Sequence, residues 1–139
     1  MEKKALITGA SRGIGAACAK RLSRGGYRIF LNYNRSEKEA KELAEKVGGM
    51  ALQADVSNRA QVEKMFDKTG GVDLLVCNAG IARQQMFQDI TEDSWRELFA
   101  VNVNGVFHCC QCALPHMLSQ KSGRIVTISS ISVSYTHLK

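Results

Sequence analysis

The sequence predicts an α/β protein whose core is a doubly wound parallel sheet. Two observations lead to this fold class. Short apolar segments alternate strictly with segments whose apolar residues recur at helical spacing, and polar residues follow directly after the apolar segments. Strict alternation implies right-handed crossovers, which place a parallel sheet between two layers of helices. The length of 139 residues corresponds to one domain.

The first predicted strand and helix enclose a glycine-rich stretch. Residues 3–7 are largely apolar and predict a short strand, and the glycine-rich residues 8–15 follow it. A helix is indicated from near Gly13 by apolar residues at helical spacing: Ile14, Cys18, Ala19 and Leu22. The apolar residues 28–33 predict the second strand.

The third strand follows a helix with a recognisable start. Ser36 is a predicted N-cap, and Glu39 occupies the capping-box position of a helix that runs to Val47. Two glycines end this helix, and residues 50–54 predict the third strand.

The second half of the chain repeats the alternation. Ser57 or Asn58 caps the next helix, and residues 72–77 predict the fourth strand. Thr91 caps a long helix that is expected to reach Leu118.

One face of that long helix is apolar, and the face is formed by Trp95, Leu98, Phe99 and Val103. A bend is expected at Pro115, because proline removes a helical hydrogen bond. Residues 124–128 predict the fifth strand, which ends in Ser129 and Ser130.

The glycine-rich residues 8–15 are suited to bind a phosphate group. At the start of a helix the backbone N–H groups have no partner within the helix, and the helix dipole favours an anion. One glycine permits a tight turn, one lets the backbone approach a pyrophosphate, and one lets the helix pack against the strand. An ordinary glycine-rich turn is the alternative; the strand before it and the helix after it favour a phosphate site.

Composition and charge are those of an ordinary globular protein, with 45% hydrophobic and 23% charged residues. The net charge is +6, but Lys and Arg are scattered among Glu and Asp. An anionic cofactor or substrate explains this excess, and no nucleic-acid partner is predicted. No apolar run approaches the ~20 residues of a membrane span. Because the first strand begins almost at Met1, no signal peptide is predicted and a cytoplasmic location is expected.

The five cysteines indicate neither a disulfide framework nor a metal site. Cys109 and Cys112 form a CxxC pattern, but it lies in mid-helix rather than at a helix start, where a redox thiolate is stabilised. His108, Cys112 and His116 share one helical face, and core packing is the favoured interpretation of this set. No metal is predicted, and a reducing compartment fits the free thiols.

Four motifs in order resemble the short-chain dehydrogenase/reductase family, whose domain has a Rossmann fold. Residues 8–15 resemble its cofactor loop, and the resemblance extends from residue 3 to about residue 131. Asp55-Val56 is similar to the segment after its third strand that carries the adenine-contacting aspartate, and Asn78-Ala79-Gly80 is similar to its turn after the fourth strand. The resemblance implies a cofactor site formed by Gly9, Ser11, Arg12, Gly13, Ile14, Gly15, Asn34, Arg35, Asp55, Val56, Asn78, Ala79 and Gly80.

The resemblance also implies an activity, which is hydride transfer between a nicotinamide and a carbonyl or alcohol. Ser130 matches the catalytic serine that orients the carbonyl, and Asn102 matches a helix asparagine that anchors a water chain. The family completes its site with a tyrosine and a lysine four residues later, whose charge lowers the tyrosine pKa.

The sequence departs from the family pattern after Ser130. Tyr135 and Lys139 have the tyrosine–lysine spacing, but Tyr135 follows Ser130 by only five residues, too few for the loop and helix turn of the family. We therefore interpret this spacing as accidental. Residues 1–139 are expected to form a single nucleotide-binding domain, truncated after the fifth strand, incomplete at its C-terminus and inactive alone.

NADP is the predicted cofactor. An NAD-selective site ends the second strand with an acid for the ribose hydroxyl, but no acid precedes Glu37 here. Arg12 and Arg35 would instead flank a 2′-phosphate.

Within the family, the sequence is most similar to 3-oxoacyl-acyl-carrier-protein reductases. A small-molecule or carrier-protein-bound carbonyl substrate is thus implied, together with a homo-oligomer for the full-length parent. Two alternatives remain open at this stage. One is a reductase for an aminopentanone modification of elongation factor P, and the other is a non-catalytic nucleotide-binding protein on the same fold.

Overall fold

The protein forms one parallel five-stranded sheet, seen in a computed structural model that describes residues 1–130. The strand order is β3-β2-β1-β4-β5. The strands are β1 (Lys4–Ile7), β2 (Arg28–Tyr33), β3 (Met50–Gln53), β4 (Leu74–Cys77) and β5 (Arg124–Thr127). The chain builds outward from β1 to β3, then crosses back and builds outward from β4 to β5. The order therefore reverses between β1 and β4, where ligands of open α/β sheets bind.

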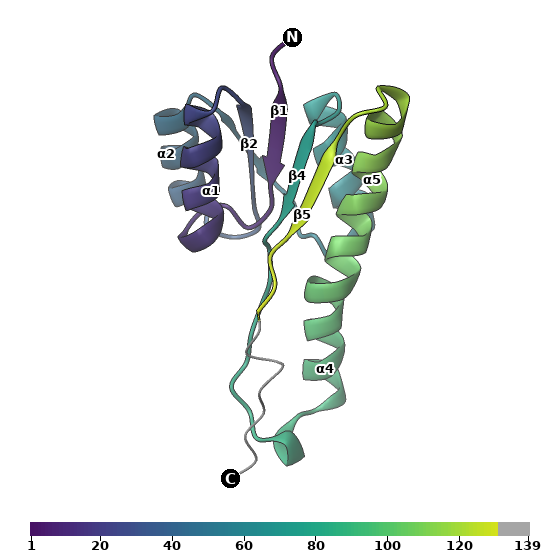
Figure 1. Ribbon diagram of the computed structural model, residues 1–139. Coiled ribbons are helices and arrows are strands. Elements are labelled where there is room, and N and C mark those ends of the chain that lie inside the picture. Colours follow the sequence, from purple (N-terminus) through teal and green to yellow (C-terminus); the bar gives the residue numbers. More distant parts are fainter. Residues whose placement is uncertain (131–139) are drawn as a thin grey trace.

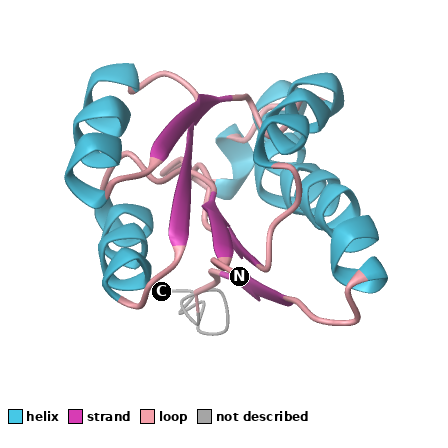
Figure 2. Ribbon diagram, turned by 90° about the horizontal axis from the view of Figure 1, so that it is seen from above, coloured by secondary structure: helices cyan, strands magenta, loops and turns pink. Residues whose placement is uncertain are grey.

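Helices cover both faces of the sheet (Figures 1 and 2). The helices are α1 (Gly13–Arg24), α2 (Glu37–Val47), α3 (Arg59–Thr69), α4 (Glu92–Phe99) and α5 (Gly105–Ser119). Helices α1 and α2 lie on one face, and α3 and α5 lie on the other (Figure 1). The predicted doubly wound parallel sheet is thus confirmed.

Alternate residues of each central strand enter different layers of the core. Ala5 and Ile7 of β1 pack with the α1–α2 layer, whereas Leu6 packs with the α3–α5 layer. Because both faces are covered, the central strands are apolar at nearly every position, as is typical of parallel sheets.

The helix starts show which capping predictions were right. The side chains of Asn58 and Thr91 accept hydrogen bonds from the backbone N–H groups of Gln61 and Ser94 at 3.1 Å each, so both are N-caps. The capping box predicted at Ser36 is wrong, because its side chain makes no capping hydrogen bond. Its backbone, at φ −84° and ψ 64°, is outside the extended conformation in which an N-cap usually directs its oxygen toward the helix.

The long helix predicted over residues 91–118 changes geometry in its middle. A π-helical turn, Ala100–Asn104, joins α4 to α5, and α5 continues through Pro115. The departure from α geometry therefore lies at the π turn rather than at the proline. Such turns often occur at functional sites.

The outer side of this helix carries an exposed apolar stripe. Its members recur every four residues, and their exposed fractions are 52% for Trp95, 44% for Phe99, 50% for Val103 and 58% for Phe107. The rings of Trp95 and Phe99 stack with their centroids 4.9 Å apart. Among the described residues, no helix is both long enough and apolar enough for a transmembrane span.

At the amino-terminal edge of the sheet, Asp73 connects three strands. Its carboxylate accepts hydrogen bonds from the backbone N–H of Lys4 at 2.8 Å and from Gln120 Nε2 at 3.0 Å. Its backbone carbonyl accepts from the N–H of Arg124 at 2.9 Å. The Lys4 N–H bond holds the pKa of Asp73 below its ordinary value.

Asp73→Asn should lower the free energy of unfolding by about 1 kcal/mol at neutral pH, because one carboxylate oxygen is replaced by a donor that faces another donor. The lowered pKa of Asp73 means that this stabilisation is present at neutral pH and is lost as the pH falls through the folded-state pKa. Urea denaturation at a series of pH values measures it. Asp67→Asn, on the exposed side of α3, is the control; equal effects of the two changes would contradict the role of Asp73.

Candidate functional site

The loop between β1 and α1 lies at the carboxyl edge of the sheet, beside the end of β4. Gly9 has φ +59°, a left-handed conformation that favours glycine. A Cβ atom on Gly9 would lie 2.8 Å from the Cα of Ala79. The loop can therefore pass the end of β4 only with glycine at this position.

The other two glycines of the loop have different surroundings. A Cβ on Gly15 would lie 2.6 Å from Asn78 Nδ2 and 2.7 Å from the Gly9 carbonyl, so Gly15 allows α1 to pack against the strand ends. Gly13 also has a positive φ of +59°, but a Cβ there would meet no atom within 4 Å. The start of α1 is thus open at Gly13.

Thr8 and Asn78 fasten this loop to the turn after β4. The hydroxyl of buried Thr8 accepts hydrogen bonds from the backbone N–H groups of Asn78 and Ala79, both at 2.9 Å. In return, Asn78 Nδ2 donates to the carbonyls of Thr8 at 3.1 Å and Gly9 at 2.9 Å. Two predicted site segments, residues 8–15 and 78–80, therefore meet.

Asn102, in the π turn, contacts the chain that follows β4. Its Oδ1 accepts from the N–H of Ile81 at 2.8 Å, and its Nδ2 donates to the Ile81 carbonyl at 2.8 Å. A Cβ on the neighbouring Gly80 would lie 3.3 Å from Asn102 Oδ1. Asn102 thus holds the chain just beyond the Asn78-Ala79-Gly80 turn.

Asp55 and Val56 follow β3 and form a fixed turn. Asp55 Oδ1 accepts from the N–H of Ser57 at 2.9 Å and from its hydroxyl at 2.7 Å. Val56 is buried against α5, where a Cβ on Gly105 would lie 2.7 Å from Val56 Cγ2. The Val56 carbonyl also accepts a hydrogen bond from His108 Nδ1 at 2.9 Å.

The remaining predicted residues lie at the rim of the site, around the ends of the neighbouring strands. Ser11 is half-buried, and Arg12, Ile14, Asn34 and Arg35 are exposed around the ends of β1 and β2. Ser130 is exposed beyond β5, where Ile128 N–H donates to the Cys77 carbonyl at 2.9 Å and keeps the chain beside β4. Tyr135 and Lys139 lie outside the described residues.

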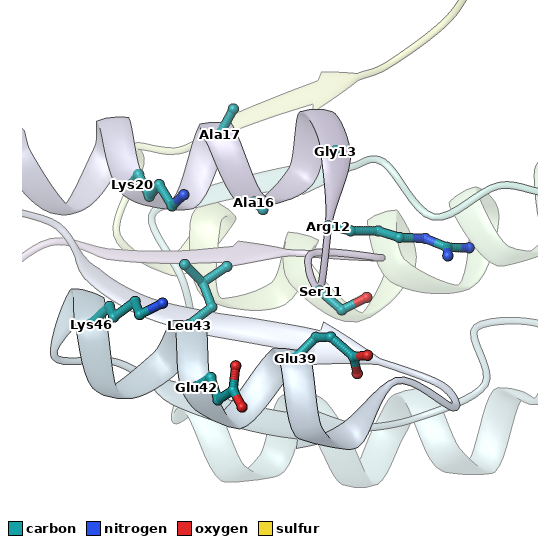
Figure 3. A pocket seen from close by; sticks show the side chains of 10 residues that line it. All are labelled: Ser11, Arg12, Gly13, Ala16, Ala17, Lys20, Glu39, Glu42, Leu43 and Lys46. Carbon is teal, nitrogen blue, oxygen red and sulfur yellow. The ribbon is translucent and has the colours of Figure 1, made fainter.

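A cleft of about 400 Å³ borders the loop but extends away from it (Figure 3). Its walls are the facing sides of α1 and α2, with Ser11, Arg12 and Gly13 at one end and Lys20 and Lys46 at the other. The side chain of Arg12 points away from those two lysines. Because the strand ends do not line this cleft, the candidate site is defined by the loop and the β4 turn.

The thiols of α5 are not arranged for redox chemistry. Burial raises the pKa of Cys109 to about 12, so it stays protonated at neutral pH. The members of the His108, Cys112 and His116 set have different neighbours: His108 bonds to Val56, Cys112 lies near Arg59, and His116 packs over Gly71. Among residues 1–130 no group of three potential metal ligands converges.

Sequence reasoning missed two polar side chains that support the site. These are Thr8 and Asn32, neither of which is among the site residues predicted from the sequence. Both are buried: Asn32 lies inside the apolar strand β2, and Thr8 directly follows the apolar strand β1. A polar residue inside or next to an apolar strand is the signal that could have found them, since buried polar groups are almost always hydrogen-bonded.

A family model described as short chain dehydrogenase matches residues 3–137 of this chain. The protein belongs to the short-chain dehydrogenase family. The predicted resemblance is therefore confirmed.

Curated relatives in this family include bacterial reductases. The chain is 39% identical over 140 residues to the 3-oxoacyl-(acyl-carrier-protein) reductase FabG of Staphylococcus aureus strain Mu50, covering 94% of this chain and 57% of that protein. It is 38% identical over 137 residues to a 3-oxoacyl-(acyl-carrier-protein) reductase of Synechocystis, covering 92% and 56%. The chain therefore spans somewhat more than half the length of these relatives.

Solved structures of short-chain dehydrogenases have the same fold. The acetoin dehydrogenase YohF of Salmonella typhimurium matches with a TM-score of 0.88 and 35% identity, over 99% of this chain and 58% of that one. The serine dehydrogenase of Escherichia coli matches with a TM-score of 0.86 and 27% identity, over 96% and 65%.

Proposed function

We propose that this chain is part of an NADPH-dependent reductase that converts a ketone to an alcohol, and that residues 1–130 form the cofactor-binding part. The observation that carries the proposal is the open start of α1 at Gly13, held at the reversal of strand order. There the free N–H groups of the helix start face the space that a pyrophosphate would occupy.

The chain's own residues fit such a cofactor. The absence of a side chain at Gly13 leaves room for the phosphates, which the N–H groups of residues 11–14 would bind. Exposed Arg12 and Arg35 would hold the 2′-phosphate, for which the guanidinium geometry is suited. The bound nicotinamide would supply the hydride for reduction.

The adenine and the nicotinamide ribose of the cofactor would lie beside the turns after β3 and β4, respectively. Both Ser57 bonds of Asp55 fall on Oδ1, so we assign Oδ2 to the amino group of adenine. The Asn78-Ala79-Gly80 turn, fixed by Thr8 and Asn102, would border the nicotinamide ribose.

Ser130 would orient the carbonyl of the substrate by donating a hydrogen bond to its oxygen. Asn102 would support the reaction by keeping Ile81 and Gly80 in place. A 3-oxoacyl thioester carried on acyl carrier protein is the proposed substrate, since the name of the Staphylococcus aureus relative specifies this class.

NADPH should bind more tightly than NADH, and Arg35→Asp should narrow or reverse the difference. The expected change in the ratio of the two affinities is about ten-fold or more, because a charge-assisted bond to the 2′-phosphate is replaced by repulsion. Titration of cofactor fluorescence measures both dissociation constants.

Gly13→Val is the control for this titration. It should abolish binding of both cofactors while leaving the helical circular dichroism largely unchanged, because valine would fill the open phosphate position and adopt an unfavourable φ. Equal affinities of the unmodified chain for NADPH and NADH would contradict the cofactor assignment.

A chain of residues 1–139 should not oxidise NADPH in the presence of a 3-oxoacyl thioester. Reduction needs a serine and a tyrosine hydroxyl within about 3 Å of one carbonyl oxygen. Tyr135 follows Ser130 by only five residues, which are too few for the loop and helix turn that place the tyrosine beside the serine in the family. The Staphylococcus aureus relative, assayed in parallel, is the positive control. Steady oxidation that is lost in Tyr135→Phe would overturn this expectation.

The protein is also proposed to form a homo-oligomer through the apolar stripe of Trp95, Phe99, Val103 and Phe107. A stripe with regular spacing can pack against its own copy about a two-fold axis.

Trp95→Glu should weaken self-association at least ~10-fold in sedimentation equilibrium, since burying an aromatic side chain contributes about 1.5–3 kcal/mol to the free energy of association. Lys38→Glu, on exposed α2, should have little effect. Association that Trp95→Glu leaves unchanged would place the contact elsewhere, such as the exposed edge of β5.

A further inference from the structure

Asn32 is a buried polar residue inside an apolar strand. It lies in β2 between Leu31 and Tyr33, and only 1% of its surface is exposed. Burying an amide is unfavourable unless both its oxygen and its nitrogen find partners. The partners of Asn32 therefore indicate what this residue does.

Those partners lie on both sides of β2. Asn32 Oδ1 accepts from the N–H of Gly9 at 3.2 Å, and its Nδ2 donates to the carbonyl of Ala54 at 3.0 Å. The backbone carbonyl of Asn32 also accepts from the N–H of Ala10 at 2.9 Å. One residue thus connects the loop after β1 with the chain that leaves β3.

The peptide of Gly9 is held from both flanks. Its N–H donates to Asn32 at the end of β2, and its carbonyl accepts from Asn78 at the end of β4. The N–H of Gly9 is consequently occupied within the protein. The donors left for a phosphate are those further along, where α1 begins.

We infer that Asn32 is a positioning residue that sets the location of the phosphate-binding loop, although it touches no phosphate itself. The inference rests on the proposed function of this loop as the cofactor site. By fixing Gly9 and Ala10, Asn32 determines where the free N–H groups at the start of α1 lie.

Aspartate, alanine and serine would each lose at least part of this pair of contacts. An aspartate would accept from Gly9 but would place a buried negative charge against the Ala54 carbonyl. An alanine would leave both the Gly9 N–H and the Ala54 carbonyl buried without a partner. A serine is too short to span from the loop to β3.

The test compares two ligands that use different parts of the site. NADPH needs the start of α1 for its pyrophosphate, whereas adenosine 2′-monophosphate lacks the pyrophosphate and depends on the arginines and on Asp55, which is held by its own bonds to Ser57. Asn32→Ala should weaken NADPH about ten-fold or more while weakening adenosine 2′-monophosphate less than about two-fold. Isothermal titration calorimetry measures both.

Thr69→Ala is the matched control. Thr69 is also buried, and its hydroxyl donates to the Phe66 carbonyl at 2.7 Å at the opposite edge of the sheet. Thr69→Ala should therefore change the affinities for NADPH and for adenosine 2′-monophosphate by the same small factor. If Asn32→Ala leaves NADPH affinity unchanged, or weakens both ligands equally, the inference is wrong.

Amide hydrogen exchange at Gly9 provides a readout that needs no cofactor and no variant. The Gly9 amide should exchange at least ~10-fold more slowly than that of Gly13 in the unliganded protein, because only the former is bonded to Asn32. Equal exchange rates would overturn the inference even if Asn32→Ala did not fold. Failure of the unmodified chain to bind either ligand would instead overturn the proposed function and leave the exchange result to decide the role of Asn32.

Discussion

The close approach of the Gly9 backbone to Ala79 is the constraint on which this site depends. A single Cβ at Gly9 would lie 2.8 Å from the Ala79 Cα, so the loop after β1 and the turn after β4 can come together only with glycine there. Once they are in contact, the Thr8 hydroxyl and the Asn78 amide form hydrogen bonds with backbone groups of both segments. The start of α1 is thereby fixed at the place where the strand order reverses.

Two further contacts extend this arrangement across the sheet. On one side Asn32 links the loop to the end of β3, and on the other Asn102 links the β4 turn to the π turn of the long helix. The π turn places Asn102 beside Gly80 without ending the helix. The site is therefore held together mainly by hydrogen bonds between asparagine side chains and backbone groups.

The family membership and the geometry support different parts of the functional argument. The short-chain dehydrogenase model and the bacterial relatives carry the oxidoreductase class. The geometry shows what individual residues do: the glycines create space for close approach of the backbone, and the amide side chains hold backbone groups in place. Together they favour a cofactor-binding role for residues 1–130.

The sequence alone determined the strands, most of the helices and the glycine-rich loop, because these depend on spacing between near neighbours. The helix caps Asn58 and Thr91 are of the same kind, since each bonds to a residue three positions away. The capping box at Ser36 failed because the backbone conformation, not the residue type, decides whether the hydroxyl reaches the helix. Only the tertiary structure decided that the Thr8 hydroxyl accepts a hydrogen bond from the Asn78 N–H, 70 residues away. The same holds for Asn32, whose partners Gly9 and Ala54 are separated from it by 23 and 22 residues. Such contacts follow from which strands pair in the sheet, and that pairing is set by the packing of both helix layers rather than by any local pattern.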